Sequence, residues 1–259
     1  MNTTLDYITT TSNRLFKHTD PRIKFLYEFL IELCVKGNDQ YYRLKTQYHN
    51  IDHFLSSVEV FVDIYDGIVK ESIITKDPND FFCGVIATLY HDIGFLKNKD
   101  EKLGTGAQYI NCHVDRGCEF VSKNFSEILT QEEQNKICKL IKTTDYFKPN
   151  YNVGLNELGA CVALADWLSQ MSDELYVDKL ERLYKEFDEY QRFNKINMYN
   201  SFEDMVHKTP GFWNKLVKPM LHNHYYNLQQ YGTIDYVSKI EQNINILVER
   251  YELNVMVSR

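Results

Sequence analysis

The chain has 259 residues, of which 44% are hydrophobic, 14% aromatic and 25% charged. This composition excludes a disordered or low-complexity chain and allows one sizeable core. The formal net charge of −7 argues against binding of long nucleic acids, which calls for a basic face. It does not exclude a small anionic substrate, because a bound cation can reverse the charge of a local site.

The amino-terminal segment contains no apolar stretch of the kind found in a secretory signal. The longest apolar run, Phe81 to Tyr90, is too short to cross a bilayer and is typical of a buried helix. The six cysteines form no CxxC pair, and we interpret them as reduced core residues. We therefore expect a cytoplasmic protein that does not interact with membranes.

From Ile51 onwards, apolar residues recur at spacings of three and four, which predicts a helix with one buried face. The residues on that face are Phe54, Leu55, Val58, Phe61, Val62 and Tyr65. An Asp-Pro-Asn turn at residues 77–79 then introduces a second helix, predicted over Asp80 to Tyr90. This helix is apolar nearly all round, so we expect it at the centre of the fold.

A loop rich in Lys, Gly and Asp follows at residues 94–108 and could cover a site as a lid. Further helices are predicted over residues 109–125, 131–143, 155–172, 173–193, 212–230 and 233–251. The chain contains no strand-like alternation bounded by hairpin signals, no fixed repeat and no Pro/Ser-rich linker. We therefore predict one all-α domain over residues 1–259, a helical bundle with its core at about 45–193 and C-terminal helices at about 210–251 packed on it.

The segment Tyr48-His-Asn-Ile-Asp-His-Phe54 concentrates polar, titratable side chains at the start of the first of these helices. His49 and His53 are four residues apart, so both lie on one helical face. Alone, this pair is equally well explained as a surface or capping pair. Asp52 is better explained as a solvent-facing charge of the first helical turn than as a ligand.

Two further polar groups interrupt apolar helices. His91 and Asp92 end the apolar helix at Tyr90, and Asp166 interrupts the run "GACVALADWLSQM". A buried carboxylate needs a cation or several hydrogen-bond donors. Asp92 could instead cap the next segment, and Asp166 could lie on a polar stripe with Ser169.

One shared explanation accounts for these interruptions. Helices packed side by side can bring His53, His91, Asp92 and Asp166 to one divalent cation in the core of a bundle. Imidazole and carboxylate ligands suit Mn²⁺ or Mg²⁺, which we consider first, and also Fe or Zn.

The order of a histidine, a His-Asp pair and a distant aspartate resembles the signature of the HD superfamily of metal-dependent phosphohydrolases. The segment at 48–54 is similar to the Tyr-His-Asn-x-x-His motif of cyclic-nucleotide phosphodiesterases and their HD relatives. "HDIGFL" at 91–96, the later "INCHVDRGCEF" and the tail from Phe212 resemble a subgroup of small HD proteins. The resemblance covers roughly residues 45–250 and is specific in the metal motif.

The resemblance implies an HD-type helical bundle with a metal site in its core, and roles for individual residues. It implies four ligands of one metal ion: His53, His91, Asp92 and Asp166. Asp92 would bridge to a second ion if one binds, with His113 as the protein ligand of that ion. His49 matches the histidine that protonates the leaving oxygen, and a metal-bound hydroxide would attack phosphorus.

The sequence departs from the family pattern at three places. His113 is followed by Val114 where a carboxylate is expected, although Asp115 is close by. Thr144 and Asp145 stand where many two-metal relatives have a further histidine. The Glu-Asp pair that follows the HD motif in guanosine-polyphosphate hydrolases is absent, as is a Gly-Tyr-Pro triad.

Four residues near the motifs are candidates for contact with the substrate. Tyr48 and Asn50 could contact it or orient the two histidines. Trp167 could stack on a substrate ring, although a role in core packing is the stronger expectation. Gln170, one turn from Asp166, could contact the edge of a base or simply face solvent.

We therefore expect an enzyme, a metal-dependent phosphohydrolase whose substrate is a small phosphate ester, most plausibly a cyclic-nucleotide or nucleotide phosphodiester. One alternative is a non-catalytic HD-fold protein that senses a nucleotide. Another is an HD-type di-iron oxygenase, which would need more histidines than this chain has between His91 and Asp166. A homo-oligomer is compatible with the sequence.

Overall fold

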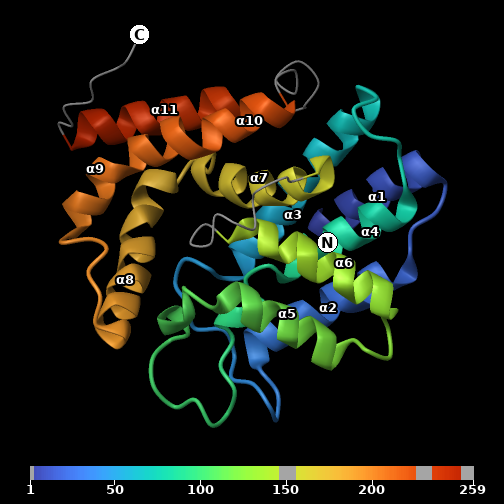
Figure 1. The fold of residues 1–259 in the computed structure, drawn as a ribbon, viewed down its shortest axis with the longest axis horizontal. Coiled ribbons are helices and arrows are strands. Elements are labelled where there is room, and N and C mark those ends of the chain that lie inside the picture. The colour runs from blue at the N-terminus through green and yellow to red at the C-terminus, as the bar shows by residue number, and fades with distance from the viewer. Residues whose placement is uncertain (1–2, 146–155, 226–234, 252–259) are drawn as a thin grey trace.

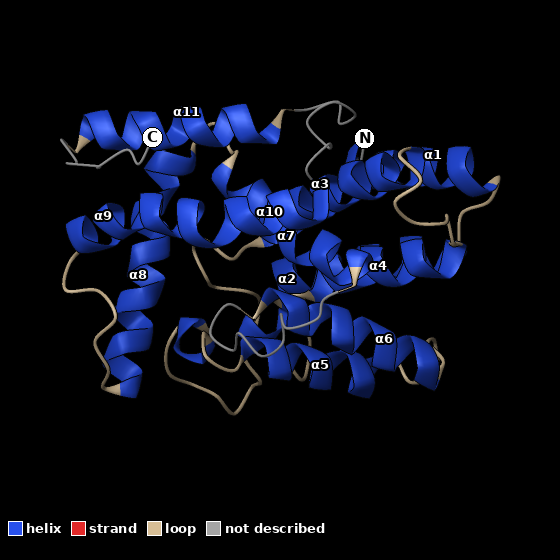
Figure 2. Ribbon diagram, turned by 45° about the horizontal axis from the view of Figure 1, so that its top comes forward, coloured by secondary structure: helices blue, strands red, loops and turns tan. Residues whose placement is uncertain are grey.

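The computed structural model describes residues 3–145, 156–225 and 235–251. The all-α prediction is confirmed: the described residues form helices and no strand, apart from an isolated bridge between Tyr41 and Asn98 (Figure 2). In chain order the helices are α1 (Thr3–Phe16), α2 (Pro21–Lys36), α3 (Ile51–Lys70), α4 (Pro78–Tyr90), α5 (His113–Asn124), α6 (Gln131–Ile141), α7 (Glu157–Met171), α8 (Tyr176–Asn194), α9 (Phe202–Phe212), α10 (Lys218–Tyr225) and α11 (Tyr236–Arg250). Short 3-10 turns η1 (Ile93–Phe95), η2 (Ala107–Tyr109) and η3 (Lys142–Thr144) and a π-helical turn η5 (Trp213–Val217) connect some of them.

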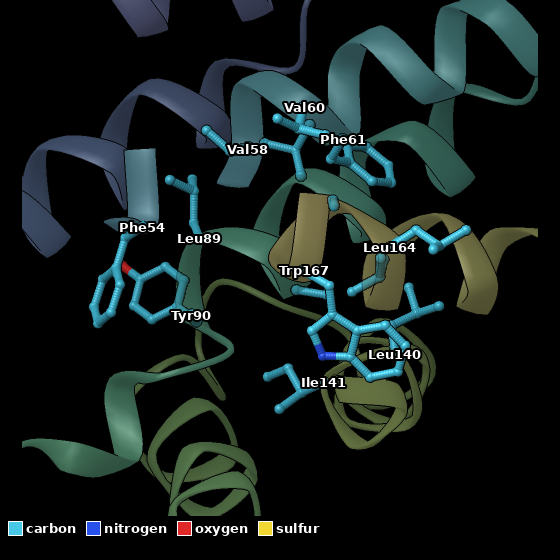
Figure 3. Close-up of a cluster of buried hydrophobic side chains, with 14 of the residues drawn as sticks. Phe54, Val58, Val60, Phe61, Leu89, Tyr90, Leu140, Ile141, Leu164 and Trp167 are labelled. Atoms are coloured by element: carbon cyan, nitrogen blue, oxygen red, sulfur yellow. The ribbon is translucent and has the colours of Figure 1, made fainter. Parts of the chain in front are cut away.

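Helices α3, α4 and α7 form the centre of the fold because they carry the most apolar sequences. All residues of α4 from Phe81 to Tyr90 are buried, as predicted for a helix that is apolar all round. Helix α3 packs against both α4 and α7. Side chains of these three helices and of α6 meet in the core, with Trp167 of α7 at one side (Figure 3).

The remaining helices cover this centre from different sides. Helix α1 packs on α3 and α4 and α2 on α4, while α5 packs on α6, which in turn contacts α4 and α7 (Figure 1). Helices α8, α9 and α11 contact one another, and α10 and α11 contact α7. The carboxyl-terminal helices therefore extend the bundle on the side of α7 (Figure 1).

The observed boundaries differ from the predicted ones where local geometry interrupts a periodic pattern. Helix α5 begins at His113 rather than near 109, because a 3-10 turn occupies Ala107–Tyr109. This 3-10 turn follows Gly106, whose φ of 121° is rarely adopted by residues other than glycine. The sequence predicts a helix that begins at Phe212, but Phe212 is the last residue of α9, which begins at Phe202. The π-helical turn η5 follows directly at Trp213.

No helix in the described parts of the chain is long and apolar enough to cross a membrane. No disulfide joins the six cysteines, all of which lie within the described residues, and the core position predicted for them holds for Cys34, Cys83, Cys118 and Cys161, whereas Cys112 and Cys138 are only half-buried.

Candidate metal centre

The start of α3 is shaped by the polar segment that precedes it. The Asn50 side-chain oxygen accepts hydrogen bonds from the amides of Asp52 (2.9 Å) and His53 (3.2 Å), which caps the helix. The Thr46 hydroxyl donates to the carbonyl oxygen of His49 (2.5 Å). His53 therefore lies in the first turn of α3 and is 7% exposed, while Asp52 faces solvent.

His91 and Asp92 lie where α4 ends and the turn η1 begins, and both are almost completely buried. The Nδ1 atom of His91 lies 2.7 Å from the carbonyl oxygen of Thr88. Because a carbonyl oxygen can only accept, Nδ1 carries a proton, and the neutral ring then has a free electron pair on Nε2. That pair suits a metal ion.

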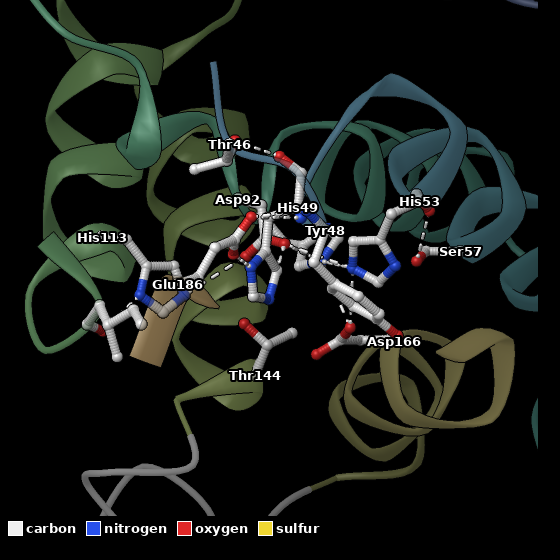
Figure 4. Close-up of polar contacts among 12 residues, drawn as sticks. Thr46, Tyr48, His49, His53, Ser57, Asp92, His113, Thr144, Asp166 and Glu186 are labelled. Carbon is white, nitrogen blue, oxygen red and sulfur yellow. Dashed lines mark hydrogen bonds and ion pairs between the residues drawn. The ribbon is translucent and has the colours of Figure 1, made fainter. Parts of the chain in front are cut away.

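Helix α7 brings Asp166 to the same point, so that donor atoms from three helices converge (Figure 4). The His53 Nε2 atom lies 3.3 Å from the Asp92 Oδ2 atom, 3.2 Å from the Asp166 Oδ1 atom and 3.3 Å from the His91 Nε2 atom. The His91 Nε2 atom lies 3.2 Å from Asp92 Oδ2 and 3.5 Å from Asp166 Oδ1. We call these four residues the metal cluster.

The metal cluster fits a divalent cation in both spacing and chemistry. Ligands bound at about 2.0–2.3 Å lie roughly 3–3.5 Å from their neighbours, as these atoms do. The Asp92 Oδ2 atom is buried and accepts no hydrogen bond from the described part of the chain. A buried carboxylate oxygen without a donor is costly, and a cation would satisfy it.

The charges of the metal cluster favour positive charge at this point. Burial alone would lower the pKa of His91, but Asp92 and Asp166 raise it well above its usual value. Burial would raise the pKa of Asp92, but His91 and His49 hold it well below its usual value. Burial would also raise the pKa of Asp166, but His91 and His53 lower it. Both carboxylates are therefore ionised at neutral pH, which is the state that binds a metal ion.

His113 contacts the opposite oxygen of Asp92. Its Nε2 atom lies 3.3 Å from Asp92 Oδ1, and its Nδ1 atom lies 2.6 Å from the carbonyl oxygen of Ile110. A Cβ atom on Gly94 would lie 1.8 Å from the carbonyl oxygen of His113, so only glycine allows the start of α5 to come this close. Asp92 thus has one oxygen toward the metal cluster and the other toward His113, the arrangement that a bridging role requires.

A second ion would have fewer protein ligands than the first. The groups of three or more metal-binding side chains in the described residues do not include His113. The carboxylate of Asp115 pairs at 4.0 Å with Lys142. Thr144, at the end of the turn η3, and the following Asp145 are buried, and Thr144 lines the large pocket over the metal cluster.

His49 lies beside the metal cluster and is held by a residue that the sequence analysis missed. Its Nδ1 atom lies 2.5 Å from Glu186 of α8, and its Nε2 atom lies 4.0 Å from Asp92 Oδ2 (Figure 4). Its ring stacks on Phe95 with centroids 4.7 Å apart. Burial alone would lower the pKa of His49, but Glu186 and then Asp92 raise it to about 9.

Glu186 is only 3% exposed, and its carboxylate also accepts a hydrogen bond from the amide of Tyr48 at 2.6 Å. A signal for it exists in the sequence. Glu186 lies three residues after Leu183 and four before Tyr190, on the buried face of α8. An acidic residue on an apolar helical face is the same kind of interruption that identified Asp166.

A pocket of about 710 Å³ lies over the metal cluster. His49, Asp92, His113, Thr144 and Asp166 line it at the cluster. Trp167, Gln170 and residues of α8, α9 and η5 form its other walls. From the loop predicted as a lid, Phe95 lines this pocket, while Glu101 of the same loop is bound to Arg116 of α5 at 2.8 Å.

The four predicted substrate-contact residues divide between two places. Trp167 and Gln170 line the large pocket, and Trp167, 3% exposed, is also part of the core. Tyr48 and Asn50 do not line it. They line a smaller pocket of about 220 Å³, which His53 and Gln170 also line. The geometry gives Asn50 the role of a helix cap, and the Tyr48 backbone the role of a contact to Glu186.

Comparison with known proteins locates the chain in a family. No curated protein matches it. The family model Npun_R2479-like matches residues 100–250. The matched segment contains His113, Asp166 and Glu186, and all of α8, α9 and η5, whereas His53, His91 and Asp92 precede it. The match covers more than half of the sequence, and the chain belongs to the Npun_R2479-like family.

Proposed function

We propose that the protein is a metal-dependent phosphohydrolase that acts on a small phosphate ester, most plausibly a cyclic-nucleotide or nucleotide phosphodiester. The observation that carries the proposal is the convergence of His53, His91, Asp92 and Asp166, with the two aspartates lining a large pocket. The order of these residues in the chain, which resembles that of the HD superfamily, supports the same reaction class.

The four residues of the metal cluster would hold the cation, with Mn²⁺ or Mg²⁺ as the first candidates. A divalent cation bound there supplies an activated water and neutralises charge on the phosphoryl oxygens. The buried carboxylate of Asp92 and the partly buried carboxylate of Asp166 would hold it, because each faces two imidazole Nε2 atoms at 3.2–3.5 Å.

His49 would act on the leaving group. The Nδ1 atom donates to Glu186, and the raised pKa of about 9 keeps the ring of His49 doubly protonated at neutral pH, so the Nε2 atom also carries a proton at the pocket. A phosphate ester bound at the metal cluster would place its leaving oxygen near this atom, which could donate the proton as the ester bond breaks. The ring is kept in this orientation by stacking on Phe95.

The proposal is tested by product formation from a panel of cyclic mono- and dinucleotides, nucleoside phosphates and simple phosphodiesters, with Mn²⁺ or Mg²⁺ supplied. Asp92→Ala runs beside the wild type, and Asp52→Asn, which removes an exposed carboxylate from the same region, serves as the control. We expect turnover by the wild type and by Asp52→Asn, and a loss of at least 10³-fold in Asp92→Ala.

Lack of turnover by folded, metal-loaded wild type on the whole panel would contradict hydrolysis. Nucleotide binding under those conditions, measured by calorimetry, would instead favour a non-catalytic sensor. Equal turnover by wild type and Asp92→Ala would show that the activity comes from another site or from a contaminant.

A further inference from the structure

The wall of the pocket formed by α9 and η5 carries three features that weaken a helix. Pro210 lies inside α9, Gly211 follows it, and the π-helical turn Trp213–Val217 comes next. Proline removes a backbone donor, glycine is a poor helix former, and π-helical turns are frequent at functional sites. Their coincidence on a pocket wall suggests that this stretch is shaped for a ligand.

Gly211 has no structural reason to be glycine. Its φ is not among the positive values that favour glycine, and a Cβ atom built on it would meet nothing within 4 Å. Gly84 and Gly94 differ, since their Cβ atoms would lie 2.1 Å from Phe61 and 1.8 Å from the carbonyl oxygen of His113. Packing therefore accounts for those two glycines, whereas Gly211 leaves open space on the pocket.

The pocket has two chemically different ends. His49, Asp92 and Asp166 make one end polar and suited to a cation. The walls from α7, α8, α9 and η5 are largely apolar, with Phe212 edge-on to Trp167 at 5.9 Å between ring centroids. The volume of about 710 Å³ far exceeds that of a phosphate group, so the apolar end would receive the organic part of the ligand.

Two polar side chains of the α9 wall are engaged within the chain, while His207 of α9 and Lys215 of η5 also line the pocket. The Thr209 hydroxyl donates to the carbonyl oxygen of Met205 at 3.0 Å, and Lys208 pairs with Asp204 at 2.9 Å. Next to Gly211, however, the pocket-lining side chains of Trp167, Phe212 and Leu216 are apolar, so recognition at this point would depend on apolar contact.

We propose that the wall around Gly211, Trp167 and Phe212 binds a flat, apolar ring system on the organic group of the ligand, with the ring packed against the bare backbone of Gly211. The substrate class is thus a phosphate ester of a bulky ring-bearing alcohol or phenol. This inference rests on the proposed function for the position of the phosphoryl group at the metal cluster.

Binding of two phosphonates to the Mn²⁺-loaded protein, measured by calorimetry, tests the proposal. Naphthylmethylphosphonate carries the ring and methylphosphonate does not, and the P–C bond of both resists hydrolysis. The variants are Gly211→Ala and Gly211→Leu, which fill the open space in two steps. Asn214→Leu adds the same side chain at an exposed position of η5 that does not line the pocket.

We expect the wild type to bind the naphthyl compound at least tenfold more tightly than the methyl compound. Gly211→Leu should lose tenfold or more of the naphthyl affinity and keep its affinity for methylphosphonate and for Mn²⁺ within about twofold. Gly211→Ala should lose less, and Asn214→Leu should behave as the wild type.

Equal affinity of the wild type for both phosphonates would overturn the proposal, as would naphthyl affinity unchanged in both Gly211 variants. Loss of affinity for both compounds in Gly211→Ala would also overturn it, because the phosphoryl group would then lie at Gly211. Failure of the proposed hydrolysis would give a different result. If no ester is turned over but binding of the naphthyl compound still depends on Gly211, the proposed ring site stands and only the proposed reaction is wrong.

Discussion

Binding of a divalent cation at the metal cluster should raise the stability of the protein, and Asp166→Asn should abolish most of that increase. A ligand present at 100 times its dissociation constant stabilises the folded state by about 2.7 kcal/mol. For a chain of this size, 1 kcal/mol corresponds to roughly 2–4 °C in Tm. The wild type should therefore gain about 5–10 °C when Mn²⁺ is added at that concentration.

Asparagine has nearly the shape of aspartate but lacks the charge that faces His53 and His91 at 3.2 and 3.5 Å. Loss of this ligand should weaken the metal affinity by at least about 100-fold, since even groups behind a ligand contribute 10–100-fold. At the same Mn²⁺ concentration the gain then falls to about 0.4 kcal/mol, or roughly 1 °C.

The assay is differential scanning fluorimetry with and without Mn²⁺, with circular dichroism to verify that the variant is folded. Asp52→Asn removes an exposed carboxylate at the start of α3 and should keep the full wild-type shift. A metal-dependent shift that persists in Asp166→Asn would refute the reasoning. So would the absence of a shift in the wild type with Mn²⁺, Mg²⁺, Fe²⁺ or Zn²⁺.

Two further predictions concern residues that act away from the cation. Glu186→Gln should lower kcat by tenfold or more, because Glu186 orients His49 rather than binding metal. Its Mn²⁺-dependent shift in Tm should stay within 2 °C of the wild-type shift. A variant that loses this shift would show that Glu186 supports the metal cluster itself. Arg22→Met should destabilise the fold by about 1–2 kcal/mol at pH 7. Arg22 binds the carboxylates of Asp20 at 2.7 Å and Glu133 at 2.8 Å, and these carboxylates cap α2 and α6. Burial would raise the pKa of Asp20, but hydrogen bonds from Arg22 lower it, and such hydrogen bonds are the main reason that the pKa of Glu133 is lowered. The stabilisation is therefore complete above the ordinary carboxyl pKa of about 4. It is lost as pH falls through the lower pKa values of the folded state. Thermal unfolding of both proteins from pH 7 to pH 3 should show the difference in Tm shrinking below about pH 4, and a constant difference would contradict the ion-pair explanation.

The fold class and the grouping of His53, His91, Asp92 and Asp166 could be predicted because both have local signals. Apolar spacing predicts helices, and each of these polar residues lies next to or within a strongly apolar run. A buried charge needs a partner, so several such interruptions in one bundle point toward one another. The structure brings the four side chains together as that reasoning requires.

The partner of His49 could not be identified in this way. Glu186 is separated from His49 by 137 positions, and its helix carries many other charges. Nothing local distinguishes Glu186 from Glu181 or Asp188 except its position on the apolar face of α8. The sequence also could not show that Asn50 caps α3 rather than contacting a ligand, because an asparagine side chain suits both roles.

Three of the four metal-cluster residues come from a different part of the chain than most of the pocket walls, while the fourth, Asp166, lies on α7 within the matched segment. His53, His91 and Asp92 come from α3, α4 and the turn after α4, whereas α8, α9 and η5 form the walls that face them. The Npun_R2479-like match begins at residue 100, after those three residues, and includes every residue of these walls from α8 onwards. If the metal cluster supplies the chemistry and the walls choose the ligand, substitutions in the walls should change which ester binds and leave the metal affinity unchanged. Gly211→Leu and Asp166→Asn, compared in both the phosphonate and the Mn²⁺ assays, separate these two contributions.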